Sequence, residues 1–462
     1  MRKIFDFIIV GSGPCGLLSA YLLSQKGSVL VIEEGLDIKE KEKDIYSYQN
    51  IIKGYQNQGI NVALGSIPVL LSEGSCLGGG SSVNSSLHHR APNYVWEEWR
   101  KIFDIYNFSQ DKVINAYEVI EKLFNAELGN IKPSIFYEKA AELNYKVSRI
   151  PRWGKENKDG VLDRFTAKKI FVKKILSNGG SIRTNTKYID SKIDRNSIWK
   201  LKIQNLENKS FYNLKSRNLV LALGASKTPI ALSNIGLKHR KLGKFEIHPT
   251  ARLSAYYPLS NSSKVVVEPF QLTGLLPKIM IGSSATKRCL SKANYPFKKN
   301  YENIDFSKVA NFYSMAPSKT KGKIILNGIL KGIKFYNIDK KTKFQISKGL
   351  KIIIDICLKS GAESIYHSGD VLDILKIKNE KYYAFFISQC IKKTLSSVHI
   401  MSSASMGNNG KLCPLNSNGS IDGIKNLLVV DQSLLPSCPT VNPQSTACVF
   451  SYINTLNFLN EL

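Results

Sequence analysis

Long apolar runs are absent from this sequence. The stretch MRKIFDFIIVGSG at the amino terminus has a charged tip, but its apolar run is short and a glycine turn interrupts it. A secretory leader needs roughly seven to fifteen apolar residues, and a membrane-spanning helix needs about 18. We therefore expect a cytoplasmic protein without a transmembrane segment, whose first residues form a strand of the fold and whose membrane contacts, if any, are peripheral.

Paired cysteines are also lacking. The eight cysteines include no C-x-x-C pair and no zinc-like spacing, and only six histidines are scattered along the chain. This pattern excludes a disulfide framework and offers no metal-ligand cluster. We expect free or buried thiols in a reducing compartment and no bound metal.

Acidic residues are scarce relative to basic ones. The chain has 65 Lys and Arg against 36 Asp and Glu, a formal charge of +29. Such an excess is compatible with nucleic acid, an anionic membrane surface or an acidic substrate. The basic residues, however, occur in short scattered pairs beside many Ile and Asn residues, which indicates a bias in coding composition. We expect no nucleic-acid partner; a basic binding protein for an anionic surface or polymer stays an alternative.

Apolar residues are plentiful enough for a large interior. The 462 residues are 43% hydrophobic and 22% charged, which is ordinary for a globular protein. A chain of this length exceeds one compact core, so we expect two interwoven domains.

The first 35 residues predict a β-α-β unit. FDFIIV (5–10) is typical of a buried parallel strand, GLLSAYLLSQKG (16–27) has helical spacing, and SVLVIEEG (28–35) is a second strand. Such units imply a doubly wound parallel sheet and an α/β fold.

The rest of the chain predicts a second, different sheet. Helical patterns lie at 95–103, 111–128, 164–180 and 347–363; strand-like runs lie at 218–224, 263–268, 277–283, 322–328 and 332–336; and NLLVVD (426–431) is a strand before a helical pattern at 442–459. The runs between about 250 and 395 favour an antiparallel sheet with helices. Residues 36–95 hold no clear periodic element and read as a long Gly-rich binding segment.

GSGPCG (11–16) is G-x-G-x-x-G directly after a strand and at the opening of a helix. In this context Gly11 permits the tight turn, Gly13 lets the backbone approach a pyrophosphate, and Gly16 lets helix and strand pack closely. Glu33, at the end of the next strand, would accept hydrogen bonds from a ribose diol and repel a 2′-phosphate, which argues against NADP. Glu34 can share or take that role.

A second glycine cluster, GGGSSVN (78–84), offers backbone without side chains, together with Ser hydroxyls and the Asn84 amide. It is either a second wall of a flat or charged ligand's site or a flexible surface loop.

Six segments, in this order, resemble landmarks of the glucose-methanol-choline (GMC) flavin oxidoreductases. They are GSGPCG with Glu33, GGGSSVN, LALGASKTP (221–229), LGKFEIHP (242–249), HIMSSASMG (399–407) and NLLVVDQSLLPSCPTVNPQST (426–446). The resemblance spans nearly the whole chain. It implies FAD as cofactor and oxidation of a primary or secondary alcohol, a sugar or polyol among the candidates, by hydride transfer to the flavin.

The resemblance also implies a set of cofactor-binding residues and a domain plan. The residues are Gly11, Gly13, Gly16, Glu33, Gly79, Ser81, Asn84, Gly224, Asp431 and Ser445. Val83 stands where some members carry the histidine that attaches FAD, so attachment at that residue is excluded. The plan has FAD-binding parts at 1–100, 151–248 and 396–462, a helical substrate-side segment at 101–150 and a substrate-binding domain at 249–395.

His399 and Asn442 are the expected catalytic pair. A histidine with a pKa near ~6.5 is suited to accept a hydroxyl proton, and His399 occupies the position that resembles the family's base. Asn442 resembles the residue that hydrogen-bonds the substrate oxygen, although Asn followed by Pro443 also predicts a helix cap and first-turn proline. If that helix begins at Asn442, its positive end would stabilise charge on a reduced flavin.

The remaining histidines are expected to matter less. His88 and His89 follow the flavin loop and could reach substrate, His248 is expected to be structural, and His239 and His367 are expected at the surface. A hydroxynitrile-type lyase on the same scaffold is a further alternative. The electron acceptor, the oligomeric state and the identity of the alcohol, for which the charge hints at an anionic group, stay open.

Overall fold

The computed structural model describes residues 4–38, 47–157, 162–259, 268–284, 305–318, 320–367, 370–373, 380–393 and 395–462. Up to residue 164 its main elements are β1 (Ile4–Val10), α1 (Pro14–Ser24), β2 (Val29–Ile32), α2 (Tyr48–Gly54), η1 (Gln56–Gly59), β3 (Val62–Leu64), β4 (Val69–Leu71), α3 (Gly80–Val83), α4 (Asn93–Phe103), α5 (Gln110–Phe124), β5 (Ala126–Glu127), α6 (Ile135–Glu142), β6 (Val147–Arg149), β7 (Arg152–Glu156) and β8 (Leu162–Arg164).

From residue 167 to 284 follow α7 (Ala167–Ser177), β9 (Ser181–Arg183), β10 (Thr186–Ile193), β11 (Trp199–Asn205), β12 (Phe211–Leu221), α8 (Thr228–Asn234), β13 (Lys244–Ile247), β14 (Thr250–Tyr256), β15 (Phe270–Leu272), η2 (Thr273–Leu275) and β16 (Met280–Ser284). The last part holds η4 (Phe306–Lys308), β17 (Val309–Met315), β18 (Gly322–Ile324), β19 (Lys334–Phe335), α10 (Lys340–Lys359), β20 (Ser364–His367), β21 (Asp370–Asp373), α11 (Glu380–Lys392), β22 (Leu395–Ser397), β23 (Ile400–Met401), β24 (Leu427–Val429), η6 (Gln432–Leu434) and α12 (Gln444–Asn460).

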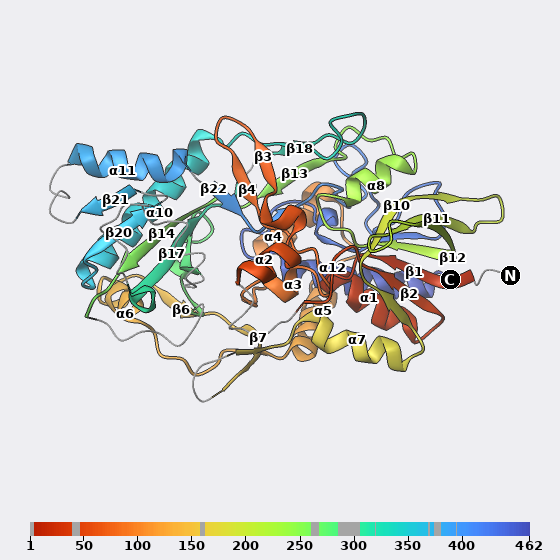
Figure 1. The fold of residues 1–462 in the computed structure, drawn as a ribbon, viewed down its shortest axis with the longest axis horizontal. Coiled ribbons are helices and arrows are strands. Elements are labelled where there is room, and N and C mark those ends of the chain that lie inside the picture. The colour runs from red at the N-terminus through yellow and green to blue at the C-terminus, as the bar shows by residue number, and fades with distance from the viewer. Residues whose placement is uncertain are drawn as a thin grey trace.

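The first sheet is built around parallel strands. Its order is β10-β11-β12-β1-β2-β9, and β24 pairs in parallel with the end of β12 beyond β11. The strands β1 and β2 are almost wholly buried, as their continuous apolar runs require. Helices α1, α7 and α12 pack together beside the sheet (Figure 1). The predicted β-α-β unit is therefore confirmed.

The second sheet is largely antiparallel and occupies the other half of the molecule (Figure 1). Its strands run β23-β13-β18-β19-β3-β4-β22-β14-β17-β16-β15-β6, with β20 paired to β14 and β21 to β20. Among the described strands of this sheet, only β19–β3 and β22–β4 pair in parallel. Helix α10 packs on β14, β16 and β17, and its Ile346, Leu350 and Ile353 are fully buried. The α/β fold with a second, antiparallel sheet is confirmed, while the domain boundaries stay a prediction.

Two local expectations are wrong and one falls outside the described residues. Segment 36–95 does contain periodic elements, because β3 and β4 join the second sheet through β19 and β22. His367 is buried, not at the surface, since β20 pairs with β14 and its Nδ1 bonds to the Arg252 carbonyl 2.8 Å away. The expected strand at 263–268 lies outside the described residues except for Glu268.

Candidate active site

A cleft lies where the glycine turn after β1 meets the ends of the neighbouring strands. It encloses about 1030 Å³ of space, part of it open to solvent. Its walls come from residues 10–16, 32–34, 72–75, 79–80 and 222–225, and from single residues that include Gln56, Lys227, Val398, Ile400, Asp431 and Gln444. This is the carboxyl edge of a parallel sheet, where α/β folds bind ligands.

The three glycines of the first turn differ in their surroundings: Gly11 and Gly16 are packed against backbone, whereas Gly13 faces free space. Gly11 has φ +103°, and a side chain there would lie 2.1 Å from the Ala222 carbonyl oxygen, while one at Gly16 would lie 2.2 Å from the Gly11 oxygen. At Gly13, by contrast, no atom lies within 4 Å of an added Cβ. Gly13 is also the N-cap of α1 and provides no side-chain cap. The free space and the uncapped N–H groups of the first turn suit a phosphate.

Glu33 is buried at the cleft edge and is held by the turn itself. Its Oε2 accepts hydrogen bonds from the Ser12 amide (2.9 Å) and hydroxyl (2.7 Å), and its Oε1 accepts one from the Gly35 amide (2.8 Å). Burial raises the pKa of Glu33 although these hydrogen bonds oppose it. Because a carboxylate oxygen accepts two bonds, Oε1 has one acceptor site left.

Glu34 points to a different partner. Its Oε2 lies 2.6 Å from Nζ of Lys227, a cleft residue at the start of α8. Because the Glu34 carboxylate is engaged by Lys227, Glu33 is the better placed of the two to accept hydrogen bonds from the hydroxyl groups of a ribose.

The second glycine segment, 78–84, packs directly against the first glycine turn, 11–16. A side chain at Gly79, where φ is +53°, would lie 2.7 Å from the Gly13 Cα. Of this segment, only Gly79 and Gly80 line the cleft. The Ser81 hydroxyl instead donates to the Gly78 carbonyl (2.7 Å) and accepts from the Ala167 amide (3.0 Å). Ser81 therefore supports the loop from behind.

Asn84 and Val83 complete this segment. The Asn84 amide nitrogen donates to Oε1 of Gln444, 2.7 Å away, and thereby joins the loop to the start of α12. Val83 is buried with Ile38 and Cys76 in a small apolar cluster. Its side chain contributes to packing.

Asp431 connects the ends of β12 and β24 at the base of the cleft. Its Oδ2 accepts from the Gly224 amide (2.9 Å) and the Thr228 hydroxyl (2.5 Å), and its Oδ1 accepts from the Ser433 amide (2.8 Å). Burial raises the pKa of Asp431 against these bonds. No atom lies within 4 Å of an added Cβ at Gly224, so that glycine also opens on free space.

His399 follows β22, between the cleft residues Val398 and Ile400. Its imidazole is half-buried and turns to His248, with the two Nδ1 atoms 2.9 Å apart and the rings nearly perpendicular at 86°. The other nitrogen of His248, Nε2, contacts Sγ of Cys438. Sequence reasoning expected His248 to be structural and did not connect it with His399, which lies 151 positions away.

Three imidazoles share this region, and burial lowers the pKa of each. The pKa of His399 falls well below its ordinary value, that of His248 to about 3 and that of His89 to about 4. His89 Nε2 lies 3.0 Å from Oε1 of the buried Gln271, which donates to the Tyr313 hydroxyl. At neutral pH these rings are uncharged, the form in which an imidazole accepts a proton.

Asn442 does not cap a helix. Helix α12 begins at Gln444 with Pro443 in the N-cap position and no side-chain cap, so the capping interpretation is wrong. The chain between the helix and Cys438 is held by Val441, which packs against Met280 and Met315 of the second sheet. Asn442 itself is half-buried, next to this contact and two residues before the cleft residue Gln444.

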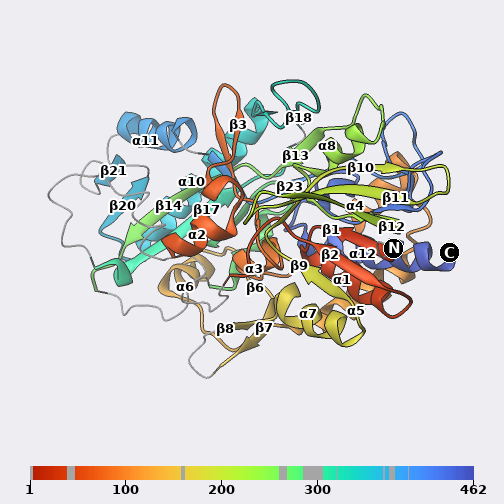
Figure 2. The ribbon, with the colours of Figure 1, turned by 45° about the vertical axis from the view of Figure 1, so that its right-hand side comes forward.

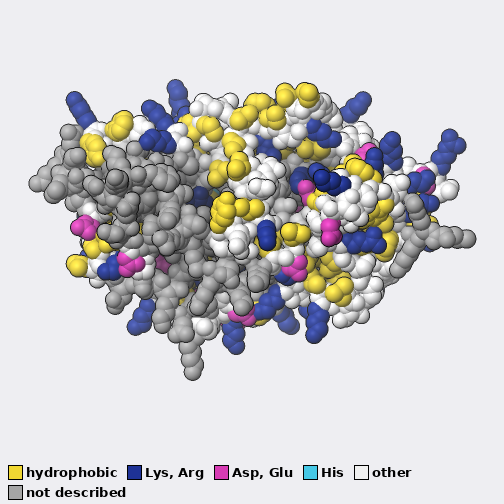
Figure 3. Space-filling model, in the orientation of Figure 1, with side chains coloured by type: hydrophobic (Ala, Val, Ile, Leu, Met, Phe, Trp, Pro, Cys, Tyr) yellow, Lys and Arg dark blue, Asp and Glu magenta, His cyan; other side chains and the backbone are white. Residues whose placement is uncertain are grey.

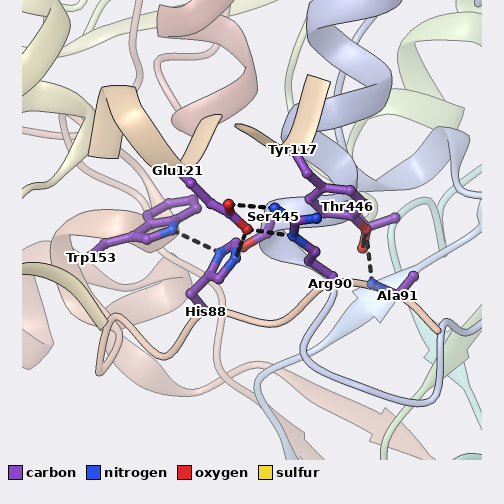
Figure 4. A network of polar contacts seen from close by, with 8 residues as sticks. All are labelled: His88, Arg90, Ala91, Tyr117, Glu121, Trp153, Ser445 and Thr446. Carbon is purple, nitrogen blue, oxygen red and sulfur yellow. Dashed lines mark hydrogen bonds and ion pairs between the residues drawn. The ribbon is translucent and has the colours of Figure 1, made fainter. Parts of the chain in front are cut away.

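Ser445 takes part in a polar network that sequence reasoning did not predict (Figure 4). Its hydroxyl lies 2.7 Å from His88 Nδ1, which the Trp153 indole N–H also approaches at 3.2 Å. Because the indole is only a donor, His88 Nδ1 is an acceptor, and its proton is on Nε2, which donates to Glu121 at 2.8 Å. The Ser445 hydroxyl thus faces the protein interior.

Arg90 and Tyr117 extend the same network. Arg90 makes two hydrogen bonds of 2.6 Å to the Glu121 carboxylate, and the Tyr117 hydroxyl lies 2.8 Å from that of Thr446 (Figure 4). Burial acts to raise the pKa of Glu121, but the hydrogen bonds from Arg90 and His88 and the positive charge of Arg90 outweigh it and lower that pKa to about 2. The only sequence signal was the HHR run at 88–90, directly after the second glycine segment.

Comparison with known proteins agrees with this arrangement. Two models described as GMC oxidoreductase match residues 5–250 and 336–451. The chain belongs to the GMC oxidoreductase family. Members of this family use FAD and oxidise CH–OH groups, and the predicted resemblance is confirmed.

Individual relatives of this GMC oxidoreductase are distant in sequence. An uncharacterized GMC-type oxidoreductase of Sinorhizobium fredii is 24% identical over 97% of this chain and 93% of its own length. A long-chain-alcohol oxidase of Arabidopsis thaliana is 24% identical over 97% of this chain and 67% of its own length. The crystal structure of pyridoxine 4-oxidase from Mesorbium loti has the same fold, with a TM-score of 0.74, 14% identity and coverage of 98% and 99% of the two chains.

Two further observations concern metals and membranes. Among the described residues, no group of three or more His, Cys, Asp or Glu side chains is arranged to hold a metal ion. None of the helices that these residues form is both long and apolar enough to cross a bilayer.

Proposed function

We propose that this protein oxidises a primary or secondary alcohol to a carbonyl, with FAD held without a covalent link and His399 as the base. The observation that supports this most directly is the neutral imidazole of His399 beside the cleft, with Nδ1 engaged by His248. Within the described part of the chain, Nε2 of His399 has no hydrogen-bond partner, which leaves it for a substrate hydroxyl.

The residues that face the cleft fit a dinucleotide. Free space above Gly13, the uncapped start of α1 and the spare acceptor site of Glu33 provide for a pyrophosphate and a ribose. When bound, the flavin supplies the acceptor for the hydride that leaves the alcohol carbon. Val83 replaces the attachment histidine and is packed away from the cleft, so this site offers no nucleophile for a covalent link.

His399 would take the proton that the hydroxyl group loses. In the tautomer with the proton on Nδ1, that N–H donates to Nδ1 of His248 and Nε2 has its lone pair free. The same bond would stabilise His399 after it has accepted a proton on Nε2. A base placed in this way contributes roughly 10² to 10⁴ in rate. Asn442 would orient the substrate oxygen by a hydrogen bond from its amide.

The relatives suggest an alcohol as the substrate but do not indicate which alcohol. One is a long-chain-alcohol oxidase, and the protein with a similar fold is a pyridoxine 4-oxidase. We propose a small alcohol, with sugars and polyols included, and an anionic group is worth testing because the chain carries a formal charge of +29. A cytoplasmic location stays a prediction.

Anaerobic flavin bleaching tests this function. The purified protein, reconstituted with FAD, should show flavin absorbance that fades when the correct member of a panel of alcohols, sugars and phosphorylated sugars is added, and admitting air then shows whether oxygen restores it. Failure to bind FAD, or bleaching by no alcohol, would overturn the proposal. Cleavage of a hydroxynitrile without bleaching would indicate a lyase instead.

Variants then test the two residues. His399→Ala should keep FAD and lose roughly 10² to 10⁴ in the rate of flavin reduction, and Asn442→Ala should weaken alcohol binding and slow reduction while FAD is kept. His239→Ala is the matched control, since that imidazole bonds to the Gly410 carbonyl, 2.9 Å away. Unchanged reduction in His399→Ala would remove His399 from the mechanism.

A further inference from the structure

One face of the ribbon β13-β18-β19-β3 in the second sheet bears partly exposed apolar side chains. In the ribbon β13-β18-β19-β3 the registered partners are Lys244 with Lys323, Lys323 with Phe335, and Phe335 with Leu64. Partners in register point to the same side of a sheet. Phe335 and Leu64 are 42% and 45% exposed, so this side faces solvent.

The opposite side of the same ribbon is part of the core. Ala63 and Ile324 alternate with the exposed residues along their strands and are at most 1% exposed, as is Phe245 on β13. All three belong to the apolar cluster beneath the second sheet. The sheet is therefore buried on one side and bears apolar side chains on the other, where polar residues are the rule for an antiparallel sheet.

The hairpin that joins β18 to β19 adds an apolar tip. Its turn is ordered by backbone hydrogen bonds from Lys331 to Gly328 (3.2 Å) and from Gly332 to Ile325 (2.8 Å). At the tip Ile329 is 100% exposed and Leu330 is 51% exposed, with Lys331 next to them. An exposed aliphatic side chain such as Ile329 adds little to the free energy of folding, and an exposed apolar patch with a polar rim is typical of an interaction site.

Ile60, just before β3, extends the patch and is 74% exposed. The hairpin tip, β3 and β18 lie at the top of the molecule in both ribbon views (Figures 1 and 2). Figure 3 shows hydrophobic side chains along this upper edge with Lys and Arg around them. We name the set Ile60, Leu64, Lys244, Lys323, Ile329, Leu330, Lys331 and Phe335 the apolar-basic patch.

The positive charge of the apolar-basic patch favours an anionic partner. The two segments that supply most of it, 60–71 and 322–338, contain no Asp or Glu, and the second holds the exposed Lys323 and Lys331. Exposed apolar side chains beside lysines are what an interfacial protein offers to the acyl boundary and to anionic headgroups. A nucleic acid would leave Ile329 and Leu330 without contacts, and a second copy of this chain would bring like charges together.

From these observations we propose that the apolar-basic patch docks the protein on an anionic phospholipid bilayer, with the 327–331 hairpin tip inserted at the headgroup boundary. The patch lies near the cleft along the sheet. From β19 the order runs β3-β4-β22, and Val398, directly after β22, lines the cleft and is 48% exposed. Docking would thus bring the cleft mouth near the membrane.

Vesicle sedimentation tests this proposal with the full chain reconstituted with FAD. Binding should be strong to vesicles of phosphatidylcholine with phosphatidylserine and weak to phosphatidylcholine alone. Ile329→Ser with Leu330→Ser, and separately Lys331→Glu, should each reduce partitioning about tenfold, given roughly 1 kcal/mol per basic charge and more per buried aliphatic side chain. Both tip residues are exposed, so these variants should fold and keep FAD.

A matched control lies on α7, at the bottom of the molecule in Figures 1 and 2. There Leu176 is 51% exposed and Lys173 is exposed, so Leu176→Ser with Lys173→Glu removes the same chemistry elsewhere and should leave vesicle binding unchanged. Equal losses in the control and the tip variants would mean that net charge alone attracts the vesicles, and would overturn the proposal.

Insertion has its own readout. The four Trp residues (Trp96, Trp99, Trp153 and Trp199) are all buried, so Ile329→Trp introduces an exposed indole whose emission should shift to the blue with anionic vesicles. An unshifted emission, retention on heparin that exceeds vesicle binding, or dimers that form through the patch would each contradict lipid docking. Binding is measured without substrate, so these outcomes are separate from the alcohol assay.

Discussion

The Nδ1 atoms of His248 and His399 lie 2.9 Å apart, so each imidazole limits the proton position of the other. Two neutral rings in this contact share one proton between the facing nitrogens, and the ring that accepts must carry its own proton on Nε2. Beyond His248 lies Cys438, whose pKa burial raises, so its thiol stays protonated. His248 is thus a positioning residue for the proposed base.

Replacing His248 should change how His399 depends on pH. Burial lowers the pKa of His399, so its base form is complete at neutral pH and is lost only as pH falls through that lowered value. In His248→Ala the space left would admit water, raise the pKa of His399 toward ~6.5 and move the acidic limb of the pH–rate profile for flavin reduction upward. The rate at pH 8 should fall about tenfold or more. An unmoved acidic limb would leave His248 a packing role only.

Gly13 and Gly16 should respond differently to alanine. The free space at Gly13 predicts that Gly13→Ala folds as the parent apoprotein does but binds FAD at least about tenfold more weakly, because the methyl group occupies the ligand's space. In Gly16→Ala the methyl group would meet the Gly11 carbonyl at 2.2 Å, so the free energy of unfolding of the apoprotein should fall by roughly 1–3 kcal/mol. Thermal unfolding of both apoproteins and titration with FAD separate the two effects.

Glu33 and Glu34 provide a matched pair at the ribose end. Glu33→Gln would replace an acceptor with a donor where the Ser12 and Gly35 amides already donate, and should weaken FAD binding about ten- to hundredfold. Glu34→Gln removes the ion pairs with Lys227 and Lys187, and surface pairs contribute about 0–1 kcal/mol each. Fluorescence titration of the apoprotein measures both affinities. Equal losses would transfer the ribose role to Glu34.

Glu121 should contribute to stability against acid. Its pKa in the folded protein is about 2, below the ~4.3 of an unfolded Glu, so its stabilisation is complete above ~4.3 and is lost as pH falls toward 2. Glu121→Gln should lower the free energy of unfolding at pH 7 by about 1–3 kcal/mol, because the negative charge is lost and an NH2 donor replaces one of the two oxygens that accept from His88 and Arg90. The difference from the parent should shrink below pH 4. Urea titrations from pH 3 to 7 measure it, with the exposed Glu118→Gln of the same helix as control.

Several features were predictable from local pattern. The apolar run 5–10, the glycine spacing at 11–16 and the acidic end of the second strand each describe neighbours in sequence, and the structure places them together as a strand, a turn and a cleft edge. The antiparallel part was visible as separate apolar runs between 250 and 395. What could not be predicted was that β3 and β4, from a segment without clear periodicity, fill the gap between β19 and β22.

The candidate active site, like the fold, contains features that the sequence predicted and features that it did not. Sequence reasoning named Ser445 and Ser81 as cofactor contacts, and the structure turns both hydroxyls to protein partners, His88 and the Gly78 carbonyl. It missed Glu121 and Arg90, because a helix residue and a loop residue 31 positions apart show no shared pattern. The sequence predicted that the last helix starts at Asn442, whereas α12 starts at Gln444 with Pro443 in the N-cap position.

By itself, the sequence determined the elements whose signal is local: the β-α-β unit, the glycine turn and the family to which the ordered segments belong. Only the tertiary structure decided which distant side chains meet, as His248 and His399 do across 151 positions, and which apolar residues stay in solvent, as Ile329 does. The reason is physical. Hydrogen bonding and burial at one residue depend on neighbours that the folded sheets bring together. The spacing of residues in the sequence does not indicate those contacts.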